Sequence, residues 1–420
     1  MRRIFLFAIT QLLLLTACGG GSSDLTNSSG GGGNGSSSGN TIAGAAANVV
    51  SMTVDSGPAG ANTGVFNIPY VTVTVCAPGS TTACQTIDHV EVDTGSYGLR
   101  IIGSVLSTSM RAALPQEQSS VGGALVECTQ FGDGIAWGSM RTADVTVSSE
   151  KASSVPMQVI GDPNYPDSNI PSDCTTHGTP EDTVALFGAN GILGVGPFVQ
   201  DCGDGCVAST QNNVYFSCPS GGGTCSDVDT PLNLQAANPV ASFTTDNNGV
   251  IVELPTIADA GALTATGALV FGIGTQSNNG LGSATVLTTD SSGYITIKFN
   301  NVEYADSFID SGSNLNFIID SAVNVCGTSP NQVFCPSSEL SVSATNIGFN
   351  NAQSVVNFNI GDSTTLFNDN PTYAAFDNVA APNPDSQGFD FGLPFFYGRN
   401  VYTAIQGMNT SGGTGPYFAY

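Results

Sequence analysis

The residues with the clearest capacity for chemistry are two aspartates in nearly identical surroundings. The chain contains the segments Val92-Asp93-Thr94-Gly95-Ser96 and Ile309-Asp310-Ser311-Gly312-Ser313. Hydrolysis by an activated water needs one carboxylate as a base and one carboxylic acid as a proton donor. Two Asp side chains held a few ångströms apart can supply both, because such close like charges cannot both ionise and the pair shares one proton. We therefore predict that Asp93 and Asp310 form a catalytic pair.

The residues that follow each aspartate suit a loop that holds a carboxyl group in place. The hydroxyls of Thr94 and Ser311 can lock the two loops together by hydrogen bonding. The glycines after them permit close approach of the backbone. We assign loop support to the following residues: Thr94, Gly95, Ser96, Ser311, Gly312 and Ser313.

The Asp-Ser/Thr-Gly pattern alone is weak evidence, because a chain rich in these residues produces it by chance. A third copy, Asp55-Ser56-Gly57, lacks an apolar continuation and is predicted to be a simple turn. The other two copies each follow apolar residues typical of a buried strand. The elements around each aspartate must therefore distinguish a catalytic loop from a chance match to the pattern.

Short apolar runs separated by turn residues dominate the chain from about residue 48. Residues 70–75 and 144–147 alternate between apolar and polar types, which indicates half-buried strands. No sustained helical periodicity follows the N-terminal segment. The 52 Gly and 21 Pro also favour turns over helices. We predict an all-β protein.

Composition narrows the class of function. The 420 residues carry 33 acidic and only 8 basic side chains, a formal net charge of −25, and are 40% hydrophobic. We do not expect nucleic-acid binding, because the chain has too few basic side chains to neutralise phosphates. The hydrophobic content argues against global disorder, and the length allows a large core divided into two or three domains or lobes.

The N-terminus has the features of an export signal. Residues 1–17 begin with Arg2 and Arg3 and continue with an apolar stretch too short to span a membrane. The sequence Leu15-Thr16-Ala17-Cys18 resembles the lipobox of bacterial lipoproteins, in which the Cys is lipidated. The alternative is an ordinary signal peptide with an incidental Cys18. Residues 18–47, rich in Gly and Ser, are expected to be a flexible tether.

The lipobox resemblance places the protein in the bacterial cell envelope, anchored in a membrane through Cys18. Outer-membrane sorting is expected, facing the periplasm or the surface. Setting Cys18 aside, ten of the 11 cysteines remain, an even number that suits an oxidising compartment. Proximity along the chain suggests four disulfides and elimination a fifth, with the pairing left as a hypothesis: Cys76–Cys84, Cys202–Cys206, Cys218–Cys225, Cys326–Cys335 and Cys128–Cys174.

A metal site or a serine hydrolase site is the competing interpretation of these residues. The chain has only His89 and His177, and it has no paired Cys-x-x-Cys spacing. A Ser-His-Asp arrangement would have to use one of these histidines, and neither lies near a suitable nucleophile motif. We therefore expect no metal and no cofactor.

Landmarks along residues 65–410 resemble the pepsin-like aspartic peptidases, in the order typical of that family. They are the two Asp loops, the flap-like segment Phe131-Gly132-Asp133-Gly134, the segment Gly191-Ile192-Leu193-Gly194 that passes behind the first Asp, and Phe391-Gly392 near the end. The resemblance implies a bilobal fold with a central cleft between two β-barrel-like lobes. We place the N-terminal lobe at 48–250 and the C-terminal lobe at 251–420, in a little-characterised bacterial lipoprotein branch.

The resemblance implies a membrane-anchored aspartic endopeptidase that acts on a peptide or protein and works as a monomer. Phe131, Gly132, Asp133 and Gly134 would then cover the substrate. The alternative is a non-catalytic lipoprotein of the same fold that captures a peptide or a glycan. Retention of both complete Asp loops favours the peptidase.

Three residues depart from the family pattern. Phe131 stands where the flap of the family usually has Tyr. Arg100 occupies the position seven residues after the first Asp, where the family usually has Trp. Trp137 either compensates for that loss or packs within the hairpin. Glu91 lies on the same strand face as Asp93, where a carboxylate would disfavour ionisation of the pair. The preferred interpretation is that Glu91 forms an ion pair with His89 or Arg100 near the strand's edge.

Overall fold

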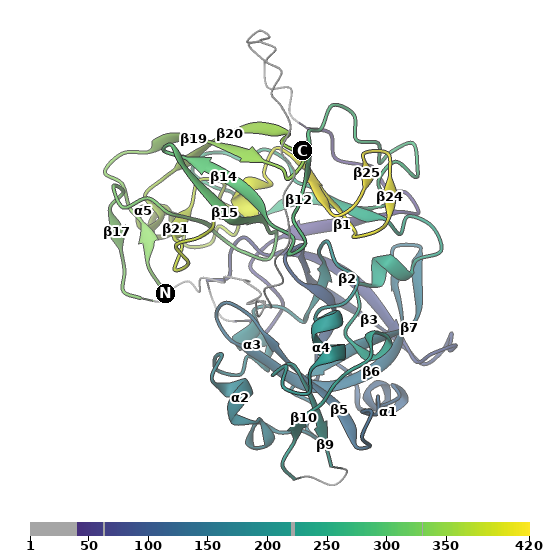
Figure 1. Cartoon of the computed structure of the whole chain (residues 1–420). Helices are drawn as coiled ribbons and strands as arrows, with labels where there is room; N and C mark the ends of the chain where they lie inside the picture. Colours follow the sequence, from purple (N-terminus) through teal and green to yellow (C-terminus); the bar gives the residue numbers. More distant parts are fainter. Residues whose placement is uncertain (1–39, 62–63, 220–222, 330) are drawn as a thin grey trace, which may run out of the picture.

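The strands of the protein form two lobes joined by a shared sheet. The computed structural model describes residues 40–61, 64–219, 223–329 and 331–420. One lobe holds the strands from the first half of the chain and the other holds β14 to β22, with β1 and β12 between them (Figure 1). Cys18 and the expected signal peptide, residues 1–17, lie outside the described residues.

The N-terminal lobe is a barrel that closes on itself. Its strands follow the order β2-β3-β8-β4-β7-β6, and β6 pairs back onto β2 to complete the ring. β5, β9 and β10 extend the sheet beyond β6. The strands are β2 (Pro69–Cys76), β3 (Cys84–Asp93), β4 (Tyr97–Ile102), β5 (Ala124–Gln130), β6 (Ile135–Val147), β7 (Glu150–Ile160), β8 (Gly191–Val195), β9 (Tyr215–Cys218) and β10 (Ser226–Asp227).

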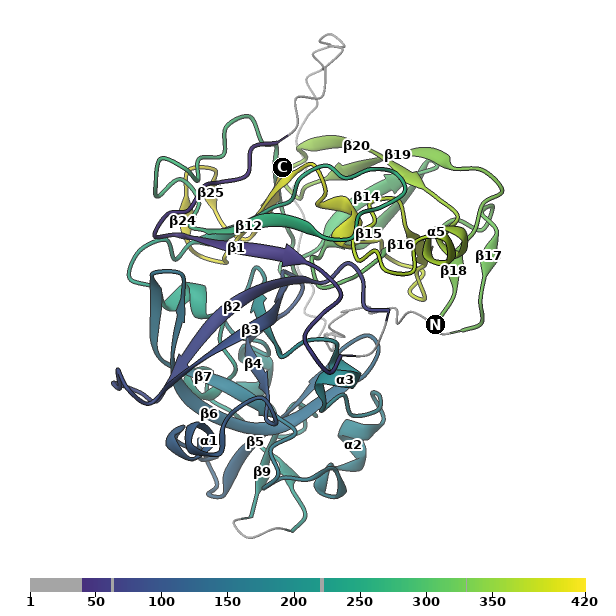
Figure 2. The same ribbon diagram turned by 180° about the vertical axis from the view of Figure 1, so that it is seen from behind.

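A run of strands between the lobes continues the same sheet in the order β1-β12-β11-β23-β26-β13. It interleaves the two halves of the chain, because β1 pairs along its whole length with β12 (Figure 2). The expected lobe boundary at residue 250 falls within β11. These strands are β1 (Val49–Val54), β11 (Gly249–Glu253), β12 (Ala265–Phe271), β13 (Val286–Thr288), β23 (Asn400–Ala404) and β26 (Tyr417–Ala419).

The C-terminal lobe is built on a second sheet with the order β20-β19-β14-β15-β22-β16-β21, and two small hairpins lie outside it. The sheet strands are β14 (Ile295–Phe299), β15 (Val302–Ile309), β16 (Asn316–Ile318), β19 (Leu340–Ile347), β20 (Gln353–Ile360), β21 (Ala380–Pro382) and β22 (Asp390–Phe391). The hairpins pair β17 (Val325–Cys326) with β18 (Val333–Phe334) and β24 (Asn409–Thr410) with β25 (Gly413–Thr414).

Helices in the described part of the chain are short, as the absence of helical periodicity predicts. The N-terminus of the first helix is capped by the side chain of Ser107, which accepts a hydrogen bond from the Met110 amide. None of the described helices is long and apolar enough to span a membrane. They are α1 (Thr108–Ala113), α2 (Ser172–Thr175), α3 (Val184–Phe187), α4 (Asp204–Ala208) and α5 (Ser363–Asp369), with 3₁₀ turns at Asp167–Asn169, Leu232–Leu234, Pro239–Ser242 and Leu393–Phe395.

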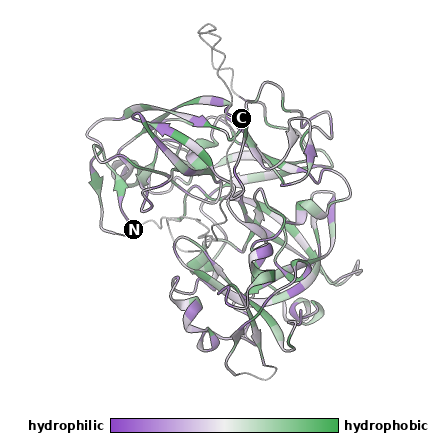
Figure 3. Ribbon diagram, viewed as in Figure 1, coloured by the Kyte–Doolittle hydropathy of each residue, from purple (hydrophilic) through white to green (hydrophobic). Residues whose placement is uncertain are grey.

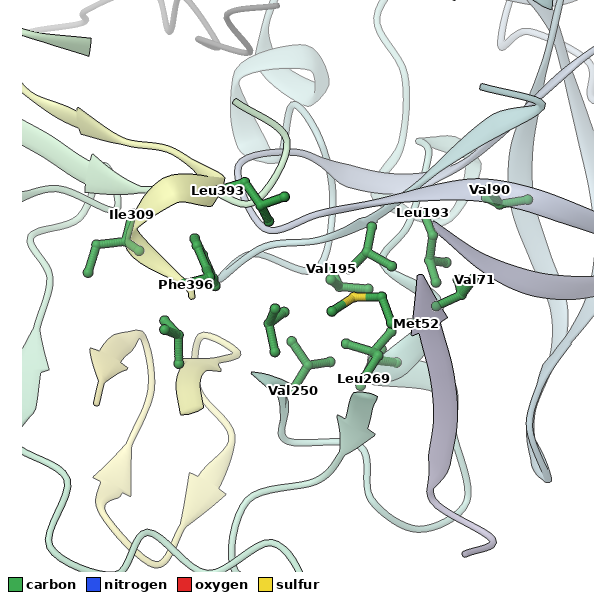
Figure 4. Packing of buried hydrophobic residues seen from close by; sticks show 14 of the residues in the cluster. Met52, Val71, Val90, Leu193, Val195, Val250, Leu269, Ile309, Leu393 and Phe396 are labelled. Carbon is green, nitrogen blue, oxygen red and sulfur yellow. The ribbon is translucent and has the colours of Figure 1, made fainter. Parts of the chain in front are cut away.

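One continuous apolar core runs through both lobes. Hydrophobic segments follow the strands inside each lobe (Figure 3). Met52 and Leu269 of the shared sheet lie between Leu193 of the first lobe and Phe396 of the second (Figure 4). All four side chains are buried, so the two lobes are packed together by the hydrophobic effect.

The five disulfides have the pairing expected from the sequence. Four of them, Cys76–Cys84, Cys128–Cys174, Cys202–Cys206 and Cys218–Cys225, lie in the N-terminal lobe, and Cys326–Cys335 lies in the C-terminal lobe. The sequence hypothesis on pairing is therefore confirmed.

The segment just before β1 differs from the expected tether. The Asn40 side chain donates hydrogen bonds to the carbonyls of Leu254 and Arg399, at 2.9 and 2.8 Å. The Ala43 amide donates to the Glu253 carboxylate at 2.6 Å. Residues 40–47 are thus bound to the C-terminal side of the molecule, ahead of the expected start of the folded body at residue 48.

Candidate active site

Asp93 ends a strand whose last four residues, 90–93, are buried on both faces. β3 runs parallel to β8, with Asp93 beside Gly194, and β8 also pairs antiparallel with β4. The chain therefore leaves β3, turns through Thr94 to Ser96 and returns as β4 on the far side of β8. A Cβ atom on Gly194 would lie 2.5 Å from the Tyr97 amide nitrogen, so only glycine allows this crossing.

The second aspartate has the same arrangement. β15 leads directly into Asp310 and runs parallel to β22, with Ile309 beside Phe391. β22 pairs antiparallel with β16, which follows the loop. A Cβ atom on Gly392 would lie 2.1 Å from the Leu315 carbonyl oxygen, so Gly392 corresponds to Gly194. One strand–loop–strand unit therefore occurs twice.

The two loops bind each other through reciprocal hydrogen bonds. The Thr94 amide donates to the Ser311 hydroxyl at 3.1 Å, and the Ser311 amide donates to the Thr94 hydroxyl at 2.9 Å. Each hydroxyl in turn donates across the interface: Ser311 to the Val92 carbonyl at 2.7 Å and Thr94 to the Ile309 carbonyl at 3.4 Å. The locking role predicted for both hydroxyls agrees with these contacts.

The two aspartate carboxyl groups lie against each other where the loops meet. Each accepts a hydrogen bond from the amide two residues on, Asp93 from Gly95 and Asp310 from Gly312, both at 2.7 Å. A Cβ atom on Gly95 would lie 2.6 Å from the Asp310 Cγ. Any larger residue at Gly95 would therefore collide with the opposite carboxyl group.

Burial sets the protonation of this pair. It raises the pKa of Asp93 from its usual value. Burial and then the charge of Asp93 hold the pKa of Asp310 well above its usual range. The pair therefore keeps its shared proton up to a higher pH than an exposed carboxyl group would.

A third carboxyl group, Asp390, is joined to the pair on the C-terminal side. The Ser313 hydroxyl lies 3.0 Å from the Asp310 carboxylate and 2.5 Å from that of Asp390. Burial raises the pKa of Asp390 well above its usual value. Sequence analysis did not single out Asp390. The available signal was its position directly before the Phe391-Gly392 landmark.

Glu91 is a fourth buried carboxyl group, and its expected ion pair is absent. The side chain has 0% exposure, and among the described residues neither of its oxygens has a hydrogen-bond partner. His89 lies 3.0 Å from Asp88 and 3.3 Å from Asp55 instead. The prediction that Glu91 pairs with His89 or Arg100 is wrong, because both partners are bound elsewhere and Glu91 lies inside the sheet.

Arg100 forms a buried ion cluster under the flap strands. Its guanidinium lies 2.5 Å from Glu127, 3.1 Å from Asp201 and 2.8 Å from the Thr129 hydroxyl on β5. Trp137 on β6 is also buried, and its indole nitrogen donates to the Tyr165 carbonyl at 3.0 Å while its ring packs edge-on against Phe216. Of the two roles considered for Trp137, these contacts match packing, but against β9 and the segment after β7 rather than within the hairpin.

The predicted flap is the turn between β5 and β6. The Phe131 amide donates to the Gly134 carbonyl at 2.8 Å, and the buried Phe131 ring packs edge-on against Phe187. Gly132 at the tip is exposed, and Asp133 is partly buried. Glu181 packs against the turn, since a Cβ atom on Gly134 would lie 2.7 Å from its Cγ.

Two other candidates from the sequence do not join this site. Asp55 of the third Asp-Ser-Gly copy accepts a hydrogen bond from the Gly57 amide at 2.9 Å, so that copy is a turn as predicted. His177 is exposed.

A cavity of about 460 Å³ lies away from the aspartate pair, in the C-terminal lobe. Its lining includes Ser343, Phe358 and Arg399, together with Asp377, whose pKa burial raises to about 6. It contains neither Asp93 nor Asp310. We place the candidate active site at the pair because paired carboxyl groups, rather than hollow space, supply acid–base chemistry.

Comparison with known proteins gives the following. No curated protein matches the chain. The solved structure of an aspartic proteinase from Irpex lacteus is similar to it, with 17% identity and a TM-score of 0.47 over 88% of this chain and 96% of that one. The pepsin-like, bilobal all-β fold stated here rests on the strand order and the paired loops. The family described as "Protein of unknown function (DUF3443)" matches residues 44–420, and the chain belongs to that family.

Proposed function

We propose that this chain is an aspartic endopeptidase that hydrolyses peptide bonds with a water held between Asp93 and Asp310. The observation that carries the proposal is the repeated strand–loop–strand unit, which brings two buried carboxyl groups together through reciprocal Thr94 and Ser311 bonds. Buried structural carboxyl groups are normally paired with cations, whereas Asp310 accepts its hydrogen bonds from the Gly312 amide and the Ser313 hydroxyl.

The two aspartates would take different roles. Asp310 carries the shared proton at rest, because burial and the charge of Asp93 both oppose its ionisation. Asp93 then removes a proton from the water as it attacks the peptide carbonyl, and Asp310 donates its proton to the carbonyl oxygen. As the carbon–nitrogen bond breaks, Asp93 passes the proton gained from water to the leaving nitrogen, and a hydroxyl of the tetrahedral intermediate returns a proton to Asp310. The fixed amides of Gly95 and Gly312 keep both carboxyl groups oriented throughout.

The proposal includes the surroundings in which the enzyme acts. An extended peptide or protein segment would lie across the pair, covered by the turn from Phe131 to Gly134, and the enzyme would work as a monomer. We propose anchoring through a lipid on Cys18, with placement in a bacterial cell envelope at the outer membrane and membership of a lipoprotein branch of the superfamily. The disulfides support an oxidising compartment.

A second candidate is a non-catalytic protein that captures a peptide or glycan. The observations that favour it are Phe131 in place of the usual flap Tyr and Arg100 in place of the usual Trp. Arg100 is committed to Glu127 and Asp201, so the altered position is a built ion cluster rather than an open one. The cluster binds Arg100 to Thr129 and Glu127 of β5 rather than to Asp93 or Asp310, and we therefore favour the peptidase.

The test is cleavage of a diverse peptide library by the purified full chain, from about pH 3 to about pH 8. Asp93→Asn and Asp310→Asn should each lower kcat about 10³-fold or more, because each removes one acid–base group. Asp55→Asn is the matched control, since it alters the third Asp-Ser-Gly copy, and it should leave cleavage unchanged. Peptide binding without cleavage at any pH, unaffected by these variants, would establish the non-catalytic candidate instead.

A further inference from the structure

The cavity in the C-terminal lobe contains two opposite charges that do not pair with each other. It has a volume of about 460 Å³ and is lined by residues of β19 and β20, at the edge of the second sheet (Figure 1). Asp377 and Arg399 both line it, and each affects the pKa of the other. The ion pairs of the described residues nevertheless include neither of them.

Asp377 and its neighbour Asn378 offer buried hydrogen-bond acceptors to the cavity. The Oδ1 atom of each is buried and has no hydrogen-bond partner among the described residues. The side-chain nitrogen of Asn378 is already bound to the Asp259 carbonyl at 3.0 Å and to the Glu339 carboxylate at 2.9 Å. Buried acceptors without a donor cost free energy unless another group satisfies them. A primary ammonium group, with three N–H donors and a positive charge, would satisfy both oxygens.

Arg399 supplies the opposite charge. Its guanidinium donates to the Phe395 carbonyl at 2.6 Å and to the Asn357 carbonyl at 3.4 Å, and its Cζ lies 4.6 Å from the centre of the Phe395 ring. These contacts hold the side chain in place, but neither carbonyl carries a charge that would neutralise it. A guanidinium has five N–H donors in a planar fork that matches a carboxylate. The complementary group for Arg399 is therefore a carboxylate of a ligand.

The sheet contributes polar side chains to the lining of the cavity. Ser341 and Ser343 on β19 stand opposite Asn359 and Asn357 on β20, so four hydrogen-bonding side chains share one face of this hairpin. Hydroxyl and amide groups of this kind both donate to and accept from a peptide group. The sheet side of the cavity therefore suits a ligand that carries polar groups between its charged ends.

We propose that this cavity binds a small zwitterion of the amino-acid class, either a free amino acid or a di- or tripeptide with both ends free. Its ammonium group would bind Asp377 and Asn378, and its carboxylate would bind Arg399. A neutral sugar could use the same hydroxyl and amide groups, but it would leave both charges of the cavity without a counter-ion. The cavity contains neither Asp93 nor Asp310, so the inference goes beyond the proposed function and does not depend on it.

Protonation of Asp377 should compete with the ligand. Burial raises the pKa of Asp377 to about 6, and the charged groups around it are Asp259 and Glu339, which raise the pKa, and Arg399, which lowers it. Asp377 is therefore mostly neutral at about pH 5 and ionised at about pH 7.5. Because an ammonium group binds the ionised form, the affinity should be about 10-fold higher at the upper pH.

The experiment measures the binding of alanine, Ala-Ala and Ala-Ala-Ala to the full chain by calorimetry. The chain carries Asp310→Asn, which prevents cleavage and lies outside the cavity. At least one of these ligands should bind at millimolar concentration or below, and its N-acetyl form and its C-terminal amide should each bind at least about 10-fold more weakly, because each lacks one charge. The ligand is altered rather than the protein, so this comparison does not depend on the folding of a variant.

Variants of the cavity then assign each charge to a residue. Asp377→Asn keeps the shape of the side chain and should abolish both the advantage of the free ammonium group and the pH dependence. Arg399→Gln should abolish the preference for the carboxylate over the amide. Glu303→Gln on exposed β15 of the same lobe is the charge-matched control and should preserve both preferences.

Four results would overturn the proposal. They are no binding of any of the three zwitterions, equal binding of the free and blocked forms, binding of a neutral disaccharide in their place, and zwitterion binding that Asp377→Asn and Arg399→Gln leave unchanged. Zwitterion binding that needs Asp377 and Arg399 would establish the site, whether or not the chain with both aspartates of the pair cleaves peptides.

Discussion

The two lobes share one loop design and place an extra acid at the same register position on opposite strands. In the N-terminal lobe, Glu91 on β3 faces the apolar Ile192 on β8. In the C-terminal lobe, Phe308 on β15 faces Asp390 on β22. Each aspartate of the pair therefore has one acidic and one apolar neighbour, but the strand that carries the acid is exchanged.

The exchange changes what each acid does. Asp390 is bound by Ser313, which also contacts Asp310, so this acid is part of the hydrogen-bond network of the pair. Glu91 has no such link among the described residues and lies near the flap acids instead. The comparison teaches that the same symmetric frame can bind one flanking acid into the hydrogen-bond network of the pair and leave the other outside it.

The disulfides give the largest expected effect on stability, because the longest bridged loop of the five lies in the N-terminal lobe. Cys128–Cys174 closes 46 residues of the N-terminal lobe, and Cys202–Cys206 closes 4. By loop-closure entropy the first should contribute about 4 kcal/mol and the second about 2 kcal/mol. Paired Cys→Ser variants of each bridge, compared by urea unfolding, should show this order.

The C-terminal bridge gives the matched control for that series. Cys326–Cys335 closes 9 residues, so its removal should lie close to the Cys202–Cys206 result rather than to the larger one. A loss at Cys326–Cys335 that equals the loss at Cys128–Cys174 would show that the lobes do not differ in this way.

The reciprocal loop bonds come next in size. Thr94→Val keeps the shape of the side chain and leaves the Ser311 amide without its acceptor, and Ser311→Ala does the same to the Thr94 amide. Each should lower the free energy of unfolding by about 1–3 kcal/mol, because a buried donor loses its partner. The double variant should cost less than the sum, since both changes break one network. Strictly additive losses would contradict a coupled pair of loops.

The frame of the site was predictable from sequence because it depends on local patterns. Apolar strands followed by Asp-Thr/Ser-Gly, and glycines where backbones cross, are written into short segments such as Val92 to Ser96. The flanking acids were harder to predict. Strand alternation correctly places Glu91 on the face of Asp93, but its lack of a partner depends on Arg100 being claimed by Glu127 and Asp201, which are distant in sequence.

Asp390 and Asn40 show the same limit in other ways. Asp390 becomes part of the site only when β22 pairs beside β15, and this contact joins residues far apart in the chain. Asn40 lies in a Gly- and Ser-rich stretch whose composition predicts a flexible coil. Its binding to the Leu254 and Arg399 carbonyls arises from tertiary structure that composition does not encode.

The smallest expected effect is a shift in the pH dependence of cleavage. The charge of Asp390 raises the pKa of Asp310, after burial and Asp93. Asp390→Asn removes the negative charge that Asp390 would carry once it ionises, so Asp310 should lose its proton at lower pH and the alkaline limb of kcat against pH should move toward acid.

The same carboxyl groups determine whether the stability of the fold rises or falls with pH. Asp310, Asp390 and Glu91 have folded-state pKa values raised above their unfolded values. Their contribution is complete below the unfolded pKa, near pH 4, and is lost as pH rises through the folded pKa. Tm should therefore fall as pH rises from about 4, and less steeply in Asp390→Asn, because an amide does not ionise in the unfolded chain.

Asp162, whose pKa is lowered mainly by hydrogen bonds from Ser139, Asn164 and Arg141 against the effect of burial, works in the opposite direction. Asp162→Asn should therefore steepen the fall, and a Tm profile that Asp390→Asn leaves unchanged would show that Asp390 is not held protonated beside the pair.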